Sequence, residues 1–312
     1  MAMAESFEGF DAADFQAFLP NKWASNLFNM ERMKVRSKMV ALGTFLEPHL
    51  LALRPFSWEV TPFSPTILNG KRVSDMVLYF TRTADQARAV APLLDSKISL
   101  PDQISNPGEH YQHVTLGVKI DADTVEAGLM VHSTAWLDVM NLLNRTKTPD
   151  EAQEFSHMIR VLPHPISIVI APGVEISSGD FLPSHLKSLE EAILNNQFLI
   201  RFGKSYLASD KAISSAAFNT TMKDLLTSLV HIWEFIAWRP ASNYLAADDT
   251  NAPVVTSDGS LVQFSTGAKV RIVGGLFDGR VGIVTDIDAK GSCKVLVGRV
   301  TVRTDLRSLQ AV

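Results

Sequence analysis

Two histidines that lie close together in the sequence are the first residues that could bind a metal. His110 and His113 are separated by two residues, and Glu109 directly precedes them. Imidazole and carboxylate groups are common ligands of zinc and other transition metals. A protein metal site needs further ligands, and no cysteine or additional histidine follows nearby in the sequence. We therefore predict no metal here and expect a solvated loop edge.

A second group of residues has the types found in a nucleophile–base pair. His132 is followed directly by Ser133 and Thr134. A hydroxyl beside an imidazole is part of Ser–His catalysis, which also requires a geometry that residue types do not establish. Ser and Thr equally favour the N-cap of a helix. Because a helix is predicted directly after them, we interpret Ser133 or Thr134 as a helix cap.

Two other residue groups offer weaker candidates for chemistry. His231 and Glu234 share one face of a predicted helix and are spaced like half of a carboxylate-bridged metal site. The second Glu-x-x-His half is missing, so no such site is predicted. Arg201, Lys204 and Tyr206 could hold an anion at a sheet edge.

The best-known catalytic and cofactor-binding motifs are missing from the sequence. It contains no Gly-x-Gly-x-x-Gly junction, no P-loop, no Gly-x-Ser-x-Gly elbow and no His-Glu-x-x-His. We therefore assign no catalytic, metal-binding or cofactor-binding residue. A binding protein is favoured over an enzyme.

A glycine-rich run near the C-terminus is the most specific feature of the sequence. Residues 274–284 contain four glycines in eleven positions, and glycine permits positive φ and close backbone approach. Short segments with period-two alternation of apolar and polar residues surround this run, for example Val270 and Ile272 alternating with Lys269 and Arg271. Such alternation, bounded by glycines, predicts a small β-barrel.

This glycine-rich run resembles the KOW motif of NusG-type transcription elongation factors and several ribosomal proteins. The matching positions are Val270, Gly275, Phe277, Gly279, Gly282, Val284 and the Ile287-Asp288 turn. The resemblance covers about 45 residues. It implies a five-stranded SH3-like barrel that contacts RNA, DNA or a protein of the transcription or translation machinery.

The run departs from the KOW pattern at two positions. Leu276 stands where such motifs often carry proline, and Asp278 where lysine is common. The carboxylate of Asp278 weakens the case for phosphate binding at the tip of the loop, because like charges repel.

The charge of the chain is divided unevenly along its length. Residues 267–312 contain eight Lys or Arg against four Asp or Glu, a net charge of +4. The rest of the chain carries −8, so that the whole has −4. A basic segment attached to an acidic one is typical of a polyanion-binding module, although small barrels are often mildly basic without any such role.

The resemblance and the charge together define a set of candidate binding residues. For nucleic acid, the expected phosphate contacts are Lys269, Arg271, Arg280, Lys294, Arg299 and Arg303. Phe277 is a candidate ring for base stacking. Gly275 and Gly279 complete the set as loop positions that allow close approach.

The elements that would position these residues indicate an α+β fold. Strands are predicted over residues 57–61, 74–83, 112–120, 125–132 and 166–170. Helices are predicted over residues 25–45, 134–144, 182–195 and 218–238, with another beginning at Thr148. Strict βαβ alternation is missing, so we expect a mixed sheet with flanking helices. Pro48 should break the first of these helices or restart it.

The chain is predicted to contain two domains: residues 1–240, a linker over 241–264, and the barrel over 265–312. The start of the chain, through Phe7-Glu8-Gly9-Phe10, Asp14-Phe15, Phe18 and Met30-Glu31-Arg32-Met33, resembles the YktB-type bacterial family of unknown function. This second resemblance spans roughly residues 5–240. It implies one α/β or α+β domain with a mixed sheet and carries no known activity.

The composition excludes several classes of protein. A single cysteine, Cys293, rules out an intramolecular disulfide framework and a multi-cysteine zinc site, and we interpret it as an inert core thiol. Apolar stretches are interrupted by charge before they reach the length of a membrane span. No signal peptide is recognisable at the N-terminus. We expect a soluble, cytoplasmic protein without a membrane partner.

Three functions are compatible with these observations. The first is a non-enzymatic protein whose KOW-like barrel docks to nucleic acid, RNA being favoured over DNA, or to a component of the ribosome or RNA polymerase. The second is an enzyme or small-molecule-binding protein with its pocket in residues 1–240 and the barrel as an accessory. The third is an interaction or assembly factor. The barrel could also bind a protein, or serve as a structural appendage.

Overall fold

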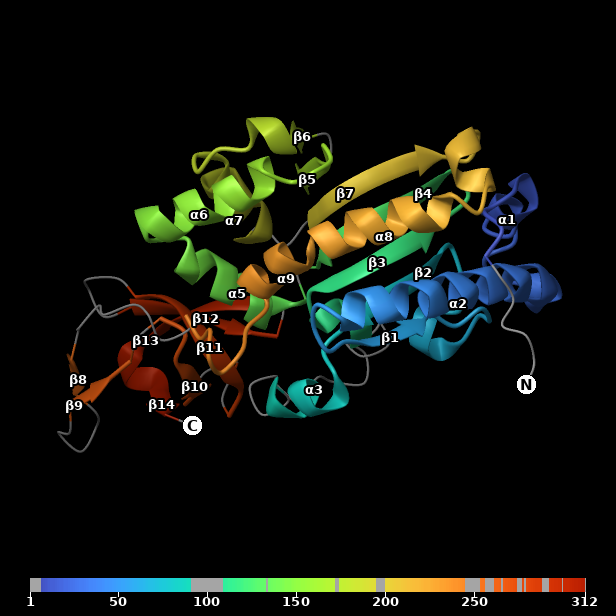
Figure 1. Cartoon of the computed structure of the whole chain (residues 1–312). Helices are drawn as coiled ribbons and strands as arrows, with labels where there is room; N and C mark the ends of the chain where they lie inside the picture. Colours follow the sequence, from blue (N-terminus) through green and yellow to red (C-terminus); the bar gives the residue numbers. More distant parts are fainter. Residues whose placement is uncertain are drawn as a thin grey trace.

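The computed structural model of the chain is α+β, as the sequence predicts (Figure 1). It describes residues 7–90, 109–132, 134–171, 174–194, 200–244, 253–255, 261–264, 266–273, 277, 279–287, 292–298 and 300–311. The described strands form a seven-stranded sheet, a separate five-stranded sheet near the C-terminus and a two-stranded sheet between them in the sequence.

The seven-stranded sheet has the strand order β1-β2-β3-β4-β7-β5-β6. Its strands are β1 (Ser57–Val60), β2 (Met76–Thr81), β3 (Thr115–Ile120), β4 (Thr124–Val131), β5 (Ser167–Ala171), β6 (Val174–Ser177) and β7 (Ile200–Leu207). All pairings between them are antiparallel. The predicted mixed sheet is therefore wrong. Residue patterns identify strands but not their direction, and β7 returns between β4 and β5 running opposite to both.

A row of glycines crosses the centre of this sheet. Gly117 of β3 lies opposite Gly128 of β4, which lies opposite Gly203 of β7. A Cβ atom added at Gly203 would lie 2.0 Å from the carbonyl oxygen of Ala127, and one at Gly128 would lie 2.1 Å from that of Phe202. No side chain fits at these distances, so the close approach of β4 and β7 requires glycine at both positions.

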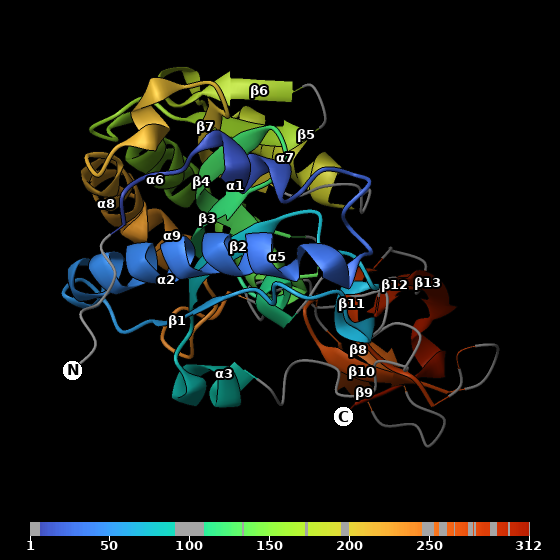
Figure 2. The same cartoon turned by 90° about the vertical axis from the view of Figure 1, so that its right-hand side faces the viewer.

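Helices cover the seven-stranded sheet. They are α1 (Ala12–Gln16), α2 (Asn29–Leu51), α3 (Ala84–Val90), α5 (Trp136–Arg145), α6 (Pro149–Arg160), α7 (His185–Leu194), α8 (Phe218–Ser228) and α9 (Val230–Ile236). Helices α2 and α8 lie side by side over the same face of the sheet (Figures 1 and 2). The core of the larger domain is mostly apolar, and within it the indole Nε1 of fully buried Trp233 of α9 donates a hydrogen bond to the carbonyl of Val114 at 2.9 Å.

Two helix predictions are corrected by the structure. Pro48 lies inside α2 instead of breaking it. It belongs to the last turn and cannot donate to the carbonyl four residues back, but the helix continues, and the carbonyl of Pro48 accepts from the amide of Ala52 at 3.2 Å. The segment predicted as one helix over residues 218–238 forms two, α8 and α9, because the chain tightens at Leu229, whose amide bonds to the carbonyl of Leu226, three residues back.

The five-stranded sheet has a small hydrophobic core of its own. Its strands, in the order β13-β12-β11-β10-β14, are β10 (Lys269–Ile272), β11 (Val281–Ile287), β12 (Ser292–Val297), β13 (Val300–Asp305) and β14 (Leu309–Ala311). All are antiparallel, and a 3₁₀ turn over Leu306–Ser308 joins the last two. Val270, Val284 and Val295 are the centre of this core. Within the described residues the edge strands β13 and β14 do not pair, so the sheet is open.

The segment between the two sheets contains short regular structure. Strands β8 (Pro253–Val255) and β9 (Leu261–Gln263) pair in an antiparallel manner within the stretch predicted as a linker. The larger core ends at Trp238, and the smaller one begins at Phe264. None of the helices in the described part of the chain has the length and hydropathy needed to cross a membrane.

Candidate nucleic-acid interface

The five-stranded sheet brings four of the predicted basic residues to one face. Directly opposed residues of antiparallel strands point to the same side, and alternate residues of one strand do too. Lys269 and Arg271 of β10 alternate with buried Val270 and Ile272 and therefore point away from the core. We call this side of the sheet the outer face.

Two further basic residues lie on the outer face, one on β12 and one on β13. Lys294 of β12 lies directly opposite Arg303 of β13 and, on its other side, opposite Asp286 of β11. All three are exposed. Like charges directly opposite each other on a sheet destabilise it, so the Lys294–Arg303 pair is not explained by folding alone. The ammonium of Lys294 forms an ion pair with Asp286 at 3.1 Å, and Nε of Arg303 donates to Ser292 Oγ at 2.9 Å.

The turn between β10 and β11 positions another predicted residue. Gly279 has φ +74°, a conformation that favours glycine, and its amide donates to the carbonyl of Ile272 at 2.8 Å. This closes the turn and places exposed Arg280 at the start of β11. The guanidinium of Arg271 lies near the same turn, 3.4 Å from the carbonyl of Gly279. Gly275 and Arg299 lie outside the described residues.

Phe277 is only partly exposed. Its side chain is half-buried and packs against the small core of the five-stranded sheet. An apolar ring next to an incomplete core gains from burial, and its role as a stacking ring stays a prediction. Cys293 is buried in the same core with Sγ 3.4 Å from the carbonyl of Thr304, as expected of a core thiol.

The histidines considered for metal binding have other partners. The ring of His110 stacks on Tyr79 at 4.5 Å between centroids and also contacts Tyr111. Nδ1 of His113 lies 3.0 Å from a guanidinium nitrogen of Arg82. Within the described residues, no group of three or more His, Cys, Asp or Glu side chains could hold a metal ion. The expectation of a solvated loop edge is wrong for both histidines, since each lies in a partly buried cluster.

His113 adjoins a buried ion pair that the sequence does not reveal. Arg82 and Asp138 are both almost completely buried, and two guanidinium nitrogens of Arg82 donate to the two carboxylate oxygens of Asp138. Burial alone would raise the pKa of Asp138, but the charge and hydrogen bonds of Arg82 lower it below the usual value. Because arginine can only donate, Nδ1 of His113 accepts, and the proton of its neutral ring lies on Nε2.

Burial displaces the pKa of both histidines. Desolvation lowers the pKa of His110 to about 4, assisted by the neighbouring His132. Desolvation also lowers that of His113 to about 4, and the positive charge of Arg82 contributes in the same direction. Both rings are therefore neutral at pH 7.

Three buried polar residues of α5 form hydrogen bonds to the backbone of the segment that follows α9. Asp138 accepts the amide of Trp238 at 2.8 Å. Asn141 accepts the amide of Tyr244 at 3.0 Å, and Asn144 donates to the carbonyl of Tyr244 at 3.1 Å. The three residues recur every third position and are all buried. Their spacing is the one sequence signal that could have identified them, since three buried amides or acids on one helix face require partners.

The remaining sequence candidates are explained by local structure. Oγ1 of Thr134 lies 2.7 Å from Nδ1 of His132 and donates to the carbonyl of Tyr111, while Ser133 lies outside the described residues. Thr134 is not the cap, because α5 begins after Ala135 and no side chain caps it. Nδ1 of His231 lies 3.4 Å from Oε2 of Glu234.

The anion-binding group proposed on β7 is not assembled. Arg201 forms an ion pair with Glu126, and the ring of Tyr206 packs edge-on against Phe218 at 5.2 Å. Arg201 and Lys204 are three residues apart on a strand and therefore point to opposite faces. The predicted shared anion site is wrong for this geometric reason.

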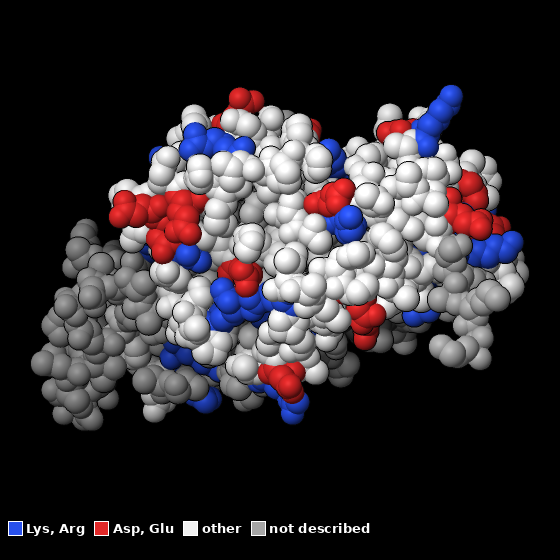
Figure 3. Space-filling view, viewed as in Figure 1, with Lys and Arg blue, Asp and Glu red and all other residues white. Residues whose placement is uncertain are grey.

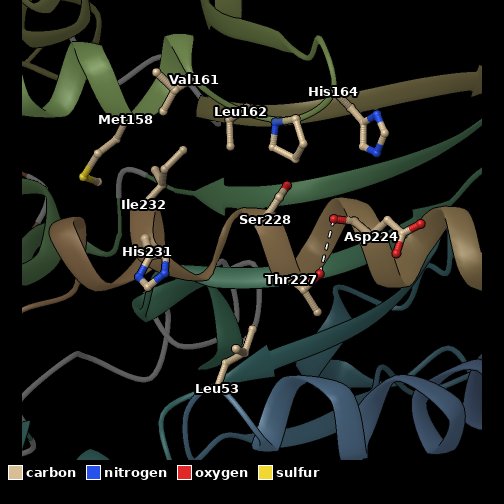
Figure 4. Close-up of a pocket in the computed structure, with 11 residues that line it drawn as sticks. Leu53, Met158, Val161, Leu162, His164, Asp224, Thr227, Ser228, His231 and Ile232 are labelled. Atoms are coloured by element: carbon tan, nitrogen blue, oxygen red, sulfur yellow. Dashed lines mark hydrogen bonds between the residues drawn. The ribbon is translucent and has the colours of Figure 1, made fainter.

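An open groove lies between α6, α8 and α9, with a volume of about 600 Å³ (Figure 4). Its lining residues include apolar Leu53, Met158, Val161 and Ile232, with Asp224 on its rim. The two histidines with displaced pKa do not line it. On the face shown in Figure 3, acidic side chains gather over α6, and no continuous basic patch covers the described larger domain.

Comparison with known proteins adds no family to these observations. No protein-family model matches the chain, and no curated protein matches it with significance. A function must therefore be argued from the residues and geometry described above.

Proposed function

We propose that this chain is a non-enzymatic binding protein that docks to nucleic acid through its C-terminal unit, with RNA favoured over DNA. The C-terminal unit is in this proposal an SH3-like barrel of the KOW type. The observation that carries the proposal is the presence of Lys269, Arg271, Lys294 and Arg303 on one outer face of the five-stranded sheet.

Phosphate neutralisation provides the affinity in this proposal. Each cation that contacts a phosphate releases condensed counterions, so that the binding constant falls with salt with a slope of about −0.9 per contact. Four contacts predict a slope of about −3.6, or a loss of roughly 150-fold between 50 and 200 mM monovalent salt. Asp286 on the same face reduces the local positive charge and keeps the affinity moderate.

The larger domain has a different role. Its segment of the chain carries a net charge of −8, and acidic side chains gather over α6. Such a surface repels polyanions, so the nucleic acid is directed to the C-terminal unit. The larger domain makes the specific contacts that the small basic face lacks.

The test compares the intact chain with a variant in which the four basic residues become glutamine, namely K269Q/R271Q/K294Q/R303Q. Binding to a fluorescently labelled RNA of mixed sequence is followed by anisotropy at several salt concentrations. We expect submillimolar binding of the intact chain and a loss of at least 100-fold in the variant. A matched control, K211Q, removes one exposed lysine of the larger domain and should leave the affinity unchanged.

Two outcomes would contradict the proposal. The first is the absence of binding to any RNA or DNA at low salt. The second is binding that the quadruple variant retains in full. Recovery of a ribosome or polymerase protein from nuclease-treated lysate by the intact chain, together with no nucleic-acid binding, would instead favour a protein partner for the same unit.

A further inference from the structure

We infer that the larger domain has a second binding surface, which docks to the surface of an anionic lipid bilayer. It lies where the segment before α2, the first turns of α2 and the loop between β1 and β2 meet. Apolar side chains project from this corner of the domain, and cations without ion pairs lie beside them. The lipid is a different ligand from the nucleic acid of the proposed function, and a different domain binds it.

The apolar part of this surface projects from the start of α2 and from the 3₁₀ turn before it. Leu27 of the turn Asn26–Phe28 is 87% exposed, and Met30 of α2 is 63% exposed. Met33 is exposed as well. Side chains three residues apart lie on neighbouring positions of one helix side, so Leu27, Met30 and Met33 form what we call the apolar ridge. Single exposed apolar residues are common, but several on one side mark an interaction surface.

Positive charge is concentrated around the apolar ridge. Residues 19–38 and 61–74 contain seven Lys or Arg and one acid, Glu31, a net charge of +6. The rest of residues 1–266 carries −14. The carboxylate of Glu31 forms an ion pair with the ammonium of Lys22 at 2.5 Å. Lys34, Lys71 and Arg72 are exposed, and none of them forms an ion pair with another described residue. Lys34 follows Met30 by four residues and so lies on the same side of α2.

A small hollow next to the 3₁₀ turn connects the two cationic segments. Arg72 lines it together with Trp23 and Ser25, and its volume is about 410 Å³. The amide of Val73 donates to the carbonyl of Trp23 at 3.0 Å, so the loop between β1 and β2 is fixed against the segment before α2. An arginine in such a hollow can bind the phosphate of a lipid headgroup through two donors.

Buried Arg32 fixes the segment that precedes the apolar ridge. Its side chain is completely buried, and its guanidinium donates to the carbonyls of Lys22 and Ser25 and to Oδ1 of Asn29. A buried cation is tolerated only where acceptors surround it, so these hydrogen bonds hold the segment in one conformation. Leu27 is therefore presented outward before any ligand arrives, and binding costs little ordering entropy.

An apolar ridge beside cations suits an anionic bilayer. Aliphatic side chains enter the boundary between headgroups and acyl chains, while Lys and Arg attract anionic headgroups. Nucleic acid offers no comparable partner for Leu and Met, because unpaired bases stack on aromatic rings. The expectation of no membrane partner rests on the lack of a membrane-spanning stretch, which contact of this kind does not need.

The experiment measures binding of the full chain to lipid vesicles by sedimentation. One set of vesicles is phosphatidylcholine alone, and the other contains roughly 30 mol% phosphatidylserine, to which we expect at least tenfold tighter binding. L27Q/M30Q should weaken binding at least tenfold, because burial of one leucine side chain already contributes that much. K34Q/K71Q/R72Q should weaken binding to the anionic vesicles by roughly 100-fold, at about fivefold per cation.

Matched variants outside this surface serve as controls. L207Q replaces another exposed leucine and K211Q another exposed lysine, and both should bind vesicles like the intact chain. K269Q/R271Q/K294Q/R303Q removes the basic face of the C-terminal unit and should change vesicle affinity less than threefold. All positions substituted on the larger domain are exposed, so these changes leave its core intact.

A polarity-sensitive dye reports insertion of the apolar ridge directly. L27C supplies a thiol for the dye, and the native Cys293 is buried. Dye fluorescence should rise at least twofold on anionic vesicles. The same dye attached through L207C should show no change.

The outcomes separate this inference from the proposed function. Equal binding to both kinds of vesicle, full retention by L27Q/M30Q, or a loss confined to the C-terminal variant would overturn the inference. A dimer that L27Q/M30Q dissociates, without vesicle binding by the intact chain, would also overturn it and assign the ridge to contact between two copies. RNA binding by L27Q/M30Q should equal that of the intact chain, so the proposed function is tested independently.

Discussion

At the scale of single residues, the most informative feature is the charged trio of Asp286, Lys294 and Arg303. Two cations placed opposite each other weaken a sheet, and one carboxylate offsets them. All three side chains are exposed, so substitutions there change the charge of the outer face without disturbing the core. The trio therefore offers changes of opposite sign on the same surface.

D286N and K294Q should have opposite effects on nucleic-acid affinity. D286N removes a carboxylate that repels phosphate, so we expect tighter binding, whereas K294Q should weaken binding by roughly eightfold at 100 mM salt and lower the salt slope by about one. Anisotropy titrations at several salt concentrations measure both. Changes in the same direction for the two variants would contradict an electrostatic role for this face.

The two histidines of the larger domain predict a pH dependence of stability. The pKa of His110 and of His113 is about 4 in the folded protein, against 6.5 for an unperturbed imidazole. The unfolded chain therefore binds more protons between these values, and the stability that is complete above pH 6.5 is lost as pH falls toward 4. The loss is at most about 3 kcal/mol per histidine.

Denaturant unfolding between pH 4 and pH 7.5 measures this dependence. H113Q retains a polar group of similar length, and its free energy of unfolding should fall less steeply with decreasing pH than that of the intact chain. Proton NMR should show two imidazoles that titrate near pH 4. Titration of all imidazoles near 6.5 would contradict the burial described for this cluster.

At the scale of elements, α5 is the helix whose side chains bind both the end of β2 and the segment that follows α9. It binds Arg82 from the end of β2, and it holds the peptide after α9 through Asp138, Asn141 and Asn144. The ring of Tyr244 lies 5.1 Å from the guanidinium carbon of Arg145 on the same helix. These contacts hold the backbone at Trp238 and Tyr244 against α5.

D138N should be the most damaging single substitution in this network. It keeps the shape of the side chain but removes the charge that compensates buried Arg82, and breaking a buried pair in this way costs about 3–5 kcal/mol. Chemical denaturation measures the loss. N141L, on the same face of α5, removes the hydrogen bonds of Asn141 to Tyr244 and Ile236 without removing a charge, and serves to distinguish a lost charge from a lost hydrogen bond. A D138N cost below about 1 kcal/mol would contradict the structural role of the pair.

The positions of helices and strands could be predicted better from the sequence than the direction and register of the strands. Residue types and alternation identified β1 to β5 and the strands β10 to β13, and Thr148 with Pro149 marked the start of α6. Strands β6 and β14 were not predicted. The direction of β7 and the register of Lys294 against Arg303 could not be predicted, because both depend on contacts between distant segments. Likewise, a list of basic residues does not show which of them share a face.

Buried polar residues explain the other failures. His113, Arg82 and Asp138 are far apart in the sequence, and each is an ordinary polar residue until the fold brings them together. The pairing of Arg201 with Glu126 was hidden for the same reason. The half-buried position of Phe277 against the small core could not be predicted, because its glycine-rich surroundings indicate only a loop.

At the scale of the whole molecule, the chain joins an acidic α+β domain to a basic sheet with a separate core (Figures 1 and 2). The net charge is −8 over residues 1–266 and +4 over residues 267–312. In the proposed function, the small unit would contact phosphate and the larger domain would orient the complex. The domain boundaries at residues 240 and 265 remain predictions from the sequence.

The measurement that tests the account most directly is the salt dependence of RNA binding by the intact chain and by K269Q/R271Q/K294Q/R303Q. The account predicts a slope near −3.6 in a plot of log binding constant against log salt for the intact chain, and a slope close to zero for the variant. A steep slope that the variant retains would place the binding surface elsewhere. No binding by the intact chain would contradict a nucleic-acid function.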